Sequence, residues 1–208
     1  MTHLVIVRHA ESAYNCENRI QGHRDSGLSA KGRRQARLLG LRIFKKHRIE
    51  RIYSSDLGRA FATTAAIAAH HPAIKVIRDP ALREINLGDW EGMTPDEVDH
   101  AHRQGYQRWL RKPSACVIPN GEPIRAFRKR VTERVRRIAR LNRGRTVLLV
   151  THGGVITALL ADWLKADFDC VLLNLRVDNT GVTLADETDT RVRLHAINDI
   201  SHLGPRDR

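Results

Sequence analysis

Two short apolar segments, each followed two residues later by a histidine, most constrain how this chain can fold. Residues 4–7 are Leu-Val-Ile-Val and precede His9, and residues 147–150 are Val-Leu-Leu-Val and precede His152. Continuous apolar runs of this length, rich in β-branched residues, are typical of strands buried on both faces of a parallel sheet. The two segments therefore predict central strands of one sheet.

Helical patterns separate these strands from one another. Apolar residues recur at helical spacing in four segments, which begin near Ser29, Leu57 (or Asp56), Pro123 and Gly153. Further strands are predicted over 51–53, 171–175, 182–185 and 192–197. The alternation predicts an α/β three-layer sandwich, in which helices flank a mostly parallel central sheet.

A single domain over residues 1–208 is the simplest organisation, because no repeat or linker-like change of composition interrupts the chain. Residues 93–120 differ from the rest, since they contain three prolines together with Tyr106 and Trp109. We expect an irregular helical excursion here, of the kind that often covers an active site. Their side chains could form a wall of a pocket or pack within the lid, and packing is the favoured role for both.

The formal net charge of +13 raises the encounter rate with any polyanion, whether nucleic acid, acidic lipid or a phosphate ester. Many of the cations lie within residues 125–145, where apolar residues recur at helical spacing. This pattern indicates an amphipathic helix with a solvated, arginine-rich face. Nucleic-acid binding is less favoured, because aromatic residues are 5% of the chain and none alternates with these arginines.

The cysteines and the N-terminal sequence together predict a cytoplasmic location without membrane association. Cys16, Cys116 and Cys170 are far apart and odd in number, which argues against a disulfide scaffold or a zinc site. We therefore expect buried thiols in a reducing compartment. The apolar run at residues 4–7 is too short for a signal peptide, and no run reaches membrane-spanning length.

The predicted strands end in side chains that suit phosphoryl transfer. Arg8 and His9 follow the first strand, His152 follows the strand at 147–150, and Arg59 lies in the first turn of the helix after the third strand. Ligands bind beyond the carboxyl ends of parallel strands, so these side chains are expected to surround one spot. The other histidines in polar stretches, including His23, are expected at the surface.

Metal-free phosphoryl transfer requires cationic donors, a nucleophile and a source of protons. Arg8 and Arg59 are suited to hold phosphate through forked hydrogen bonds, and their charges would keep His9 neutral and nucleophilic. His152 would stabilise charge on the equatorial oxygens. Glu84 is the candidate general acid and base, because its apolar neighbours would favour the protonated form. A solvent-exposed salt-bridge partner is the competing interpretation of Glu84.

Four segments in order resemble the histidine phosphatase (phosphoglycerate mutase-like) superfamily and span nearly the whole chain. They are Arg8-His9-Ala10-Glu11-Ser12 with Asn15, residues 54–60, Leu82-Arg83-Glu84, and Thr151-His152-Gly153-Gly154. The resemblance implies a covalent phosphohistidine on His9 with no metal and no cofactor. It places Arg8, Arg59 and His152 in the phosphate pocket and makes Glu84 the acid and base. It also implies that the substrate is contacted by Asn15, Gln21, Gly22 and Gly153.

Two positions depart from the family pattern. Ala10 stands where many members have glycine, which is compatible with catalysis unless the backbone there requires a positive φ. Pro123 stands where relatives often have serine, and we expect it to alter the lid side of the pocket and therefore substrate choice.

The phosphatase branch of the superfamily, with its broad-specificity, α-ribazole and metal-independent phosphoserine phosphatases, is the nearer resemblance. Phosphoglycerate mutases carry a basic and aromatic tetrad after the glutamate, and residues 85–92 of this chain have no arginine, histidine or tyrosine at the corresponding place. The expected function is metal-independent hydrolysis of a small phosphorylated metabolite. The alternatives are a cofactor-dependent phosphoglycerate mutase and, less favoured, a non-catalytic basic module that binds phosphate or nucleic acid. A homodimer through an edge strand of the C-terminal half is an expectation from symmetry.

Overall fold

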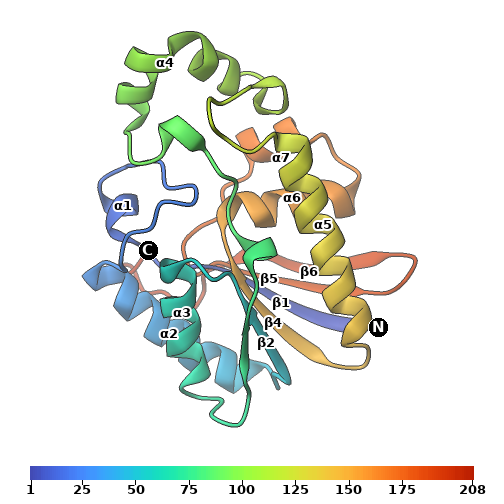
Figure 1. Cartoon of the computed structure of the whole chain (residues 1–208). Coiled ribbons are helices and arrows are strands. Elements are labelled where there is room, and N and C mark those ends of the chain that lie inside the picture. The colour runs from blue at the N-terminus through green and yellow to red at the C-terminus, as the bar shows by residue number, and fades with distance from the viewer.

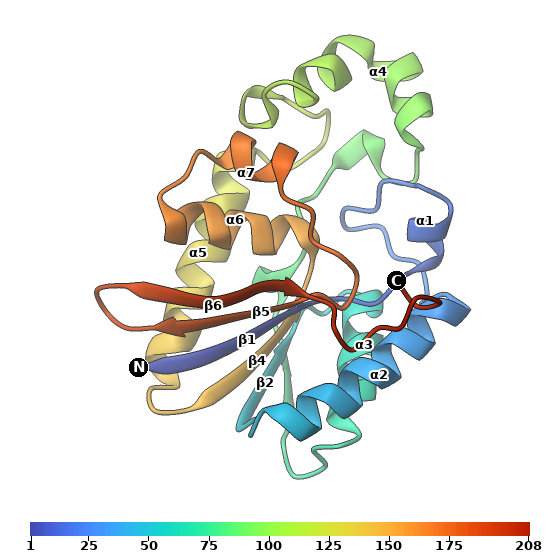
Figure 2. The same ribbon diagram turned by 180° about the vertical axis from the view of Figure 1, so that it is seen from behind.

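The computed structural model describes residues 1–208, and a six-stranded sheet with helices on both faces forms its centre (Figure 1, Figure 2). The strands are β1 (Thr2–Arg8), β2 (Arg51–Ser54), β3 (Val76–Arg78), β4 (Thr146–Thr151), β5 (Val182–Glu187) and β6 (Val192–Asp199). Their order is β3-β2-β4-β1-β5-β6, and β5 is the one strand that runs in the opposite direction to the other five. The predicted α/β fold with a mostly parallel central sheet is confirmed.

Helices α2 and α3 cover one face of the sheet, and helices α5 and α6 cover the other (Figure 1, Figure 2). The helices are α1 (Ala13–Cys16), α2 (Ala30–Lys46), α3 (Gly58–Ala68), α4 (Pro95–Trp109), α5 (Ile124–Leu141), α6 (Gly153–Leu164) and α7 (Phe168–Asn174). The predicted start near Ser29 is confirmed, since the Ser29 hydroxyl accepts a hydrogen bond from the Gly32 amide at 2.8 Å. None of the helices combines the length and the apolar character needed to cross a bilayer.

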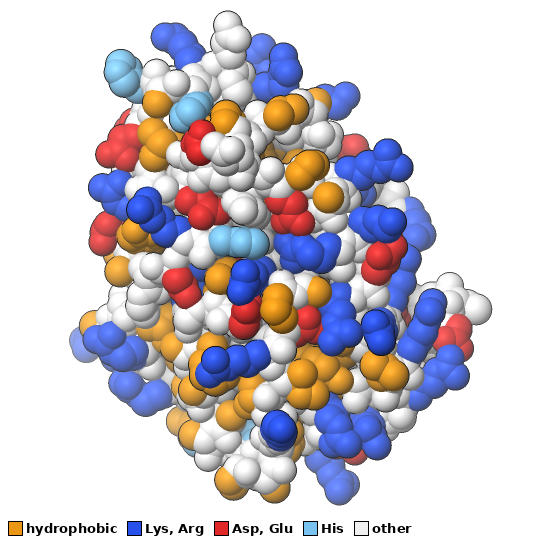
Figure 3. Space-filling view, in the orientation of Figure 1, with side chains coloured by type: hydrophobic (Ala, Val, Ile, Leu, Met, Phe, Trp, Pro, Cys, Tyr) orange, Lys and Arg blue, Asp and Glu red, His pale blue; other side chains and the backbone are white.

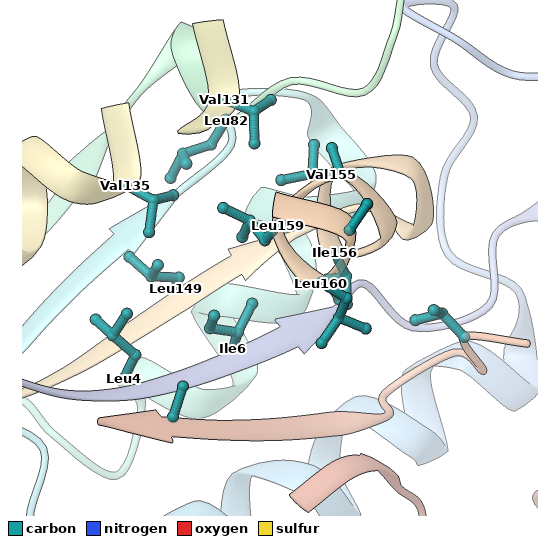
Figure 4. Close-up of a cluster of buried hydrophobic side chains, with 14 of the residues drawn as sticks. Leu4, Ile6, Leu82, Val131, Val135, Leu149, Val155, Ile156, Leu159 and Leu160 are labelled. Atoms are coloured by element: carbon teal, nitrogen blue, oxygen red, sulfur yellow. The ribbon is translucent and has the colours of Figure 1, made fainter. Parts of the chain in front are cut away.

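The apolar run of β1 is continuous because both of its faces are buried. Successive side chains of a strand point to opposite sides. Leu4 and Ile6 join the cluster under α5 and α6 (Figure 4), whereas Val5 and Val7 join the cluster under α2 and α3. Each of these four side chains is at most 2% exposed. The sheet is therefore the rigid platform on which the residues beyond its carboxyl edge stand.

The register of the sheet brings the two predicted histidines to one level. Arg8 of β1 is the Cα partner of Thr151 of β4, so His9 and His152 leave neighbouring parallel strands at the same position. Ser54 of β2 pairs with Val150 on the other side of β4. The loops after β1, β2 and β4 therefore open at the same edge of the sheet, as the sequence predicts.

The prediction of a strand over residues 171–175 is wrong, because residues 171–174 belong to helix α7 and Leu175 follows its end. Asp167 begins that helix, and its carboxylate accepts a hydrogen bond from the Cys170 amide at 2.9 Å. Phe168 and Leu172 then pack on the core cluster beneath α6. A short apolar run is compatible with a buried strand and with a buried helix, and periodicity alone does not separate them. The three-residue strand β3 was too short to be predicted.

Residues 93–120 form the predicted excursion, with α4 standing apart from the sheet beyond its carboxyl edge (Figure 1). The excursion packs on a small core of its own around Trp90, which is 1% exposed. Tyr106 and Trp109 both meet the Trp90 ring edge to face, with centroids 6.0 Å and 5.8 Å away. The predicted packing role is confirmed for Tyr106, whereas Trp109 packs on Trp90 and also lines the pocket described below.

Exposure of the cysteines differs from the prediction. Cys116 is buried, as expected, but Cys16 and Cys170 are exposed, and none of the three forms a disulfide. Cys16 lies at the end of the short helix α1 and Cys170 in the first turn of α7, both at the surface. The wide spacing of the cysteines in the sequence therefore does not predict which of them are buried.

Arginine residues of α5 form the predicted basic face, and Figure 3 shows Lys and Arg side chains along the side of the molecule that α5 occupies. The prediction that the whole face is solvated is wrong in part. Arg130 is half-buried and pairs with Glu122, while Arg134 pairs with the buried Asp79. These two arginines tie α5 to the loops before it, because their partners lie in other segments of the chain.

Candidate active site

His9 lies directly beyond β1, with its side chain only 3% exposed. Its backbone amide donates to the Thr151 carbonyl at 2.9 Å. The ring atom Nδ1 lies 2.8 Å from the Ala10 carbonyl oxygen, and because a carbonyl can only accept, Nδ1 is the protonated nitrogen. Nε2 therefore carries the free lone pair, and it accepts a hydrogen bond from Arg59 Nε at 3.3 Å.

The surroundings of His9 keep its ring neutral. Burial lowers the pKa of His9 well below its ordinary value of 6.5, and the charges of Arg59 and Arg8 lower it further. Burial and the same two arginines also lower the pKa of His152. The sequence predicted the arginine effect, but burial is the larger cause for both rings. An unprotonated His9 Nε2 is the form that can attack phosphorus.

His152 lies beside His9, with ring centroids 5.1 Å apart. Its Nε2 is 2.8 Å from the Ser55 hydroxyl, and that hydroxyl accepts from the Leu57 amide at 3.3 Å. The Ser55 proton is therefore free to be donated to Nε2, which leaves the proton of His152 on Nδ1. This Nδ1 is buried and has no hydrogen-bond partner in the protein.

Arg8 presents a second buried donor without a partner. Its Nη1 donates to the Val177 carbonyl, but Nε is buried and unpaired. A methyl group on Gly153 would lie 3.6 Å from Nε, so Arg8 runs close past the residue that follows His152. Leaving a buried donor unpaired costs about 1–3 kcal/mol, and phosphate oxygens would satisfy both Arg8 Nε and His152 Nδ1.

Arg59 is 1% exposed and is held at every nitrogen of its guanidinium group. Besides the bond to His9, Nη2 donates to the Gly22 carbonyl at 2.7 Å and Nη1 donates to Asp25 at 3.2 Å. The Asp25 carboxylate also accepts from the Gly58 and Arg59 amides, so it caps helix α3 from a distant loop. This carboxylate offsets the unfavourable position of an arginine at a helix N-terminus. No pattern in the sequence distinguishes Asp25 from a surface carboxylate.

Glu84 faces the same pocket as His9 and is half-buried. Its Oε1 accepts from the Ile85 amide and its Oε2 from the Gly154 amide, each at 3.0 Å. A methyl group on Gly154 would lie 2.4 Å from Oε1, so the second glycine after His152 is needed for this close approach. Glu84 forms no ion pair, which contradicts the interpretation of this residue as a salt-bridge partner.

Two side chains that the sequence did not single out hold the backbone of Glu84. Arg130 donates to the carbonyl oxygens of Ala81, Arg83 and Glu84 at 3.0, 3.1 and 3.3 Å. His23 Nε2 lies 2.8 Å from the Glu84 carbonyl oxygen. The prediction that His23 is a surface residue is therefore wrong, because the residue is half-buried and its ring lies against the backbone of Glu84.

Replacing Arg130 with alanine is expected to lower kcat for alkyl phosphates about 10-fold, because Glu84 loses its positioning contacts. The effect should be smaller for p-nitrophenyl phosphate, whose leaving group needs no proton. Arg130→Lys, which can replace some of the donors, should restore part of the difference. Steady-state kinetics on both ester types will measure it, and an equal loss on both would indicate a general structural defect instead.

Asn15 and Gln21 meet at the hydroxyl of Ser12, which lies 3.1 Å from Asn15 Oδ1 and 2.8 Å from Gln21 Oε1. Gly22 follows with φ of +53°, and a methyl group there would lie 2.0 Å from Glu91 Oε1. Glu91 accepts from the His23 amide at 2.7 Å and thereby fixes this loop. Asn15, Gln21 and Gly22 are all placed at the pocket.

The pocket has a volume of about 270 Å³, with a charged floor and an apolar wall. The floor holds the predicted Arg8, His9, Arg59 and Glu84. His152 lies behind His9, and Gly153 does not line the pocket, whereas Gly154 does. The wall consists of Ile20, Ile85, Leu87, Trp109, Ile124, Phe127, Phe168 and Leu172, together with the single cation Arg19. No three His, Cys, Asp or Glu side chains lie close enough together to hold a metal ion.

The two departures from the family pattern have little influence on the floor of the site. Ala10 does not adopt a positive φ and is fully buried, so alanine fits its position. Pro123 precedes the first turn of α5 and does not line the pocket, although its neighbour Ile124 does. The expected influence of Pro123 on substrate choice therefore has no direct contact to support it.

Acidification is expected to destabilise the fold while the active-site rings stay neutral. The lowered pKa values of His9 and His152 mean that both rings bind protons more weakly folded than unfolded. Above about pH 6.5 both rings are neutral in the folded and the unfolded protein, so they do not make the free energy of unfolding depend on pH. Below that pH the rings of the unfolded chain take up protons while the buried rings do not, which stabilises the unfolded state. The two rings should then reduce the free energy of unfolding by about 2–3 kcal/mol between pH 7.5 and pH 5.5.

Urea unfolding at both pH values and nitrogen-15 NMR of the imidazoles will measure these effects. His152→Gln should reduce the loss of stability by about 1–1.5 kcal/mol, the share of one ring, whereas His100→Gln, on the exposed side of α4, should leave the loss unchanged. A His9 ring that titrates near pH 6.5 in the folded protein would contradict the expectation.

Fold and site together define an α/β protein with a cationic, histidine-containing pocket at the carboxyl edge of its parallel strands. The sequence model of the histidine phosphatase superfamily, branch 1, matches residues 4–200. The chain belongs to this superfamily, and the resemblance predicted from the four motifs is confirmed.

Several relatives show how widely the similarity extends. Phosphoglycerate mutase-like protein 4 of Arabidopsis thaliana is 38% identical over 157 residues, which are 75% of this chain and 68% of that protein. The metal-independent phosphoserine phosphatase of the same plant is 31% identical over 204 residues, which are 98% of this chain and 84% of that protein. The solved structure of Bacillus stearothermophilus YhfR has a TM-score of 0.92 at 33% identity, and the match covers 97% of this chain and 99% of that one.

Proposed function

We propose that this protein hydrolyses phosphomonoesters through a phosphohistidine on His9, without a metal ion. One observation carries the proposal: the unprotonated Nε2 of His9 accepts from Arg59, and the neighbouring Arg8 and His152 each present a buried donor without a partner, Nε and Nδ1 respectively. A phosphoryl group at this point would supply the missing acceptors and lie in reach of the nucleophile. A relative named as a metal-independent phosphoserine phosphatase supports the same chemistry.

The reaction proceeds in two steps. His9 Nε2 attacks phosphorus, the bond from phosphorus to the ester oxygen breaks, and protonated Glu84 gives its proton to the leaving alcohol. The Glu84 carboxylate then takes a proton from water, the water oxygen attacks phosphorus, and the bond from phosphorus to Nε2 breaks. Arg8, Arg59 and His152 donate to the non-bridging oxygens in both steps. The Nδ1 proton of His9 stays on the ring throughout.

Hydrolysis is favoured over a mutase reaction by the residues beside Glu84. A mutase must hold an intermediate with two phosphates, so a second cationic cluster is required. Residues 85–88 supply no cation, and two of them, Ile85 and Leu87, are part of the apolar wall. A non-catalytic binding module is disfavoured, because such a module has no need for the Glu84 carboxylate opposite a neutral histidine.

The excursion at residues 93–120 is proposed to act as a lid within one domain, because Trp109 reaches from it into the pocket wall.

The three unpaired cysteines support a cytoplasmic location. A homodimer through the open edge of β6 is also proposed. Light scattering at high concentration should give twice the mass of one chain, and a monomer mass would contradict this.

Phosphate release from p-nitrophenyl phosphate in excess EDTA tests the proposal directly. We expect turnover that added Mg²⁺ or Zn²⁺ does not stimulate. Conversion of 3-phosphoglycerate to 2-phosphoglycerate faster than phosphate release would favour the mutase instead. Tight, salt-sensitive binding of a polyanion without any turnover would favour the binding module.

A further inference from the structure

We propose that the pocket selects phosphomonoesters whose alcohol part is apolar, and that it discriminates against phosphoserine and phosphoglycerate. This inference rests on the proposed phosphatase function and names the substrate class of the same site. It follows from the side chains of the pocket wall that would contact the alcohol part of the substrate.

The wall above the phosphate position is formed by aromatic and aliphatic side chains from separate elements. Trp109 comes from α4, Phe127 from α5, and Phe168 and Leu172 from α7. Ile20 closes the wall from the loop after α1. A leaving group that fills this space must lose its hydration shell, which favours an apolar group and penalises a charged one.

A substrate ammonium group finds no free carboxylate in this pocket, only the amide oxygens of Asn15 and Gln21, which already accept from the Ser12 hydroxyl. Glu84 is the one carboxylate in the lining, and both of its oxygens already accept backbone hydrogen bonds. In the proposed mechanism Glu84 also donates a proton to the ester oxygen, so it cannot serve as a fixed counter-ion. The amino group of phosphoserine would therefore be desolvated without compensation.

Apart from Arg8 and Arg59, which hold the phosphate, a substrate carboxylate finds one cation in the pocket, and the charge of that cation is already balanced. Arg19 Nη1 donates to the Gly92 carbonyl at 2.7 Å and to Glu97 at 3.1 Å. Arg19 Nε donates to Glu17, also at 3.1 Å. Two carboxylates and a carbonyl thus hold this guanidinium, which leaves little positive field for the carboxylate of phosphoglycerate or phosphoserine.

Three esters of primary alcohols separate these classes without large differences in leaving-group acidity. They are 2-phenylethyl phosphate, O-phospho-L-serine and 3-phosphoglycerate. We expect kcat/KM for 2-phenylethyl phosphate to exceed that for either charged ester by about 30-fold or more, because one phenyl group is buried. A kcat/KM for phosphoserine equal to or above that for the phenylethyl ester would overturn the inference.

Helix α7 offers a matched pair of variants for assigning the effect to the wall. Leu172 lines the pocket, whereas the adjacent Leu173 is 43% exposed and points away from it. Leu172→Asp should lower kcat/KM for 2-phenylethyl phosphate at least about 10-fold and raise it for phosphoserine, since the new carboxylate faces the amino group. Leu173→Asp should change neither value. Identical profiles for the two variants would contradict a selective role of Leu172.

Binding of non-hydrolysable analogues separates this inference from the proposed function. In 3-phenylpropylphosphonate and 2-amino-4-phosphonobutyrate, a methylene group replaces the ester oxygen of the phenylethyl and serine esters. Calorimetry should show the phenyl analogue binding about 30-fold more tightly. This preference, with no ester hydrolysed, would refute the phosphatase but support the selective pocket. Equal or reversed affinities, with esters hydrolysed, would refute only the selectivity.

Discussion

Replacement of His9 by alanine is expected to reduce phosphate release from p-nitrophenyl phosphate by roughly 10⁴-fold or more, without unfolding the protein. The nucleophile is lost, and no neighbouring side chain can replace it: His152 Nε2 is occupied by Ser55, and Nδ1 is its protonated nitrogen. Water attacking directly would still benefit from Arg8 and Arg59, so a small residual rate is expected.

The control for this variant is His100→Ala, which removes an exposed histidine of α4 outside the pocket and should keep full activity. Rapid quenching in base with phosphorus-32 substrate should trap a base-stable, acid-labile phosphoenzyme in the wild type and none in His9→Ala. A His9→Ala protein with a normal circular dichroism spectrum and more than a tenth of wild-type activity would exclude His9 as the nucleophile.

Replacement of Glu84 by glutamine is expected to separate the two chemical steps. Glutamine has nearly the same shape, but it cannot donate a proton to the alcohol or accept one from water. For an alkyl phosphate, whose leaving oxygen needs the proton, kcat/KM should fall about 10²- to 10⁴-fold. For p-nitrophenyl phosphate the first step needs little help, so the phosphoenzyme should form quickly and then hydrolyse slowly.

Stopped-flow measurement with p-nitrophenyl phosphate should therefore show a burst of close to one nitrophenolate per active site, followed by a slow steady state. Glu91→Gln is not a suitable control, because Glu91 fixes the loop at Gly22 through the His23 amide. Glu133→Gln, an exposed change on α5, is suitable. Equal losses on both esters with no burst would show that Glu84 does not transfer protons.

The sequence was sufficient for the parts of this molecule that depend on local patterns. The buried strands β1 and β4 follow from continuous apolar runs, and the meeting of His9 with His152 follows from the parallel order of those strands. The start of α6 at Gly153 follows from the change to helical spacing. These features need no knowledge of distant partners.

The features that the sequence did not predict depend on contacts between distant segments. Asp25 holds Arg59 from a loop 34 residues away, and Arg130 reaches the Glu84 loop from a helix 46 residues away. Neither carries a local pattern that distinguishes it from a surface charge. Helix α7 was missed for a different reason: its apolar run has the length of a strand, and only the cap at Asp167 and the packing on α6 favour the helix.

The separate origins of the floor and the wall of the pocket affect how this protein can change over evolutionary time. The floor is anchored to the ends of buried strands, where a substitution disturbs the core and the chemistry together. Part of the wall consists of half-buried side chains at the margin of the core, namely Ile20 after α1, Trp109 of α4 and Leu172 of α7, whereas Phe127 and Phe168 belong to the core itself. Substitutions at a few wall positions can thus change the substrate specificity of proteins descended from this one, while the residues that carry out the reaction stay the same.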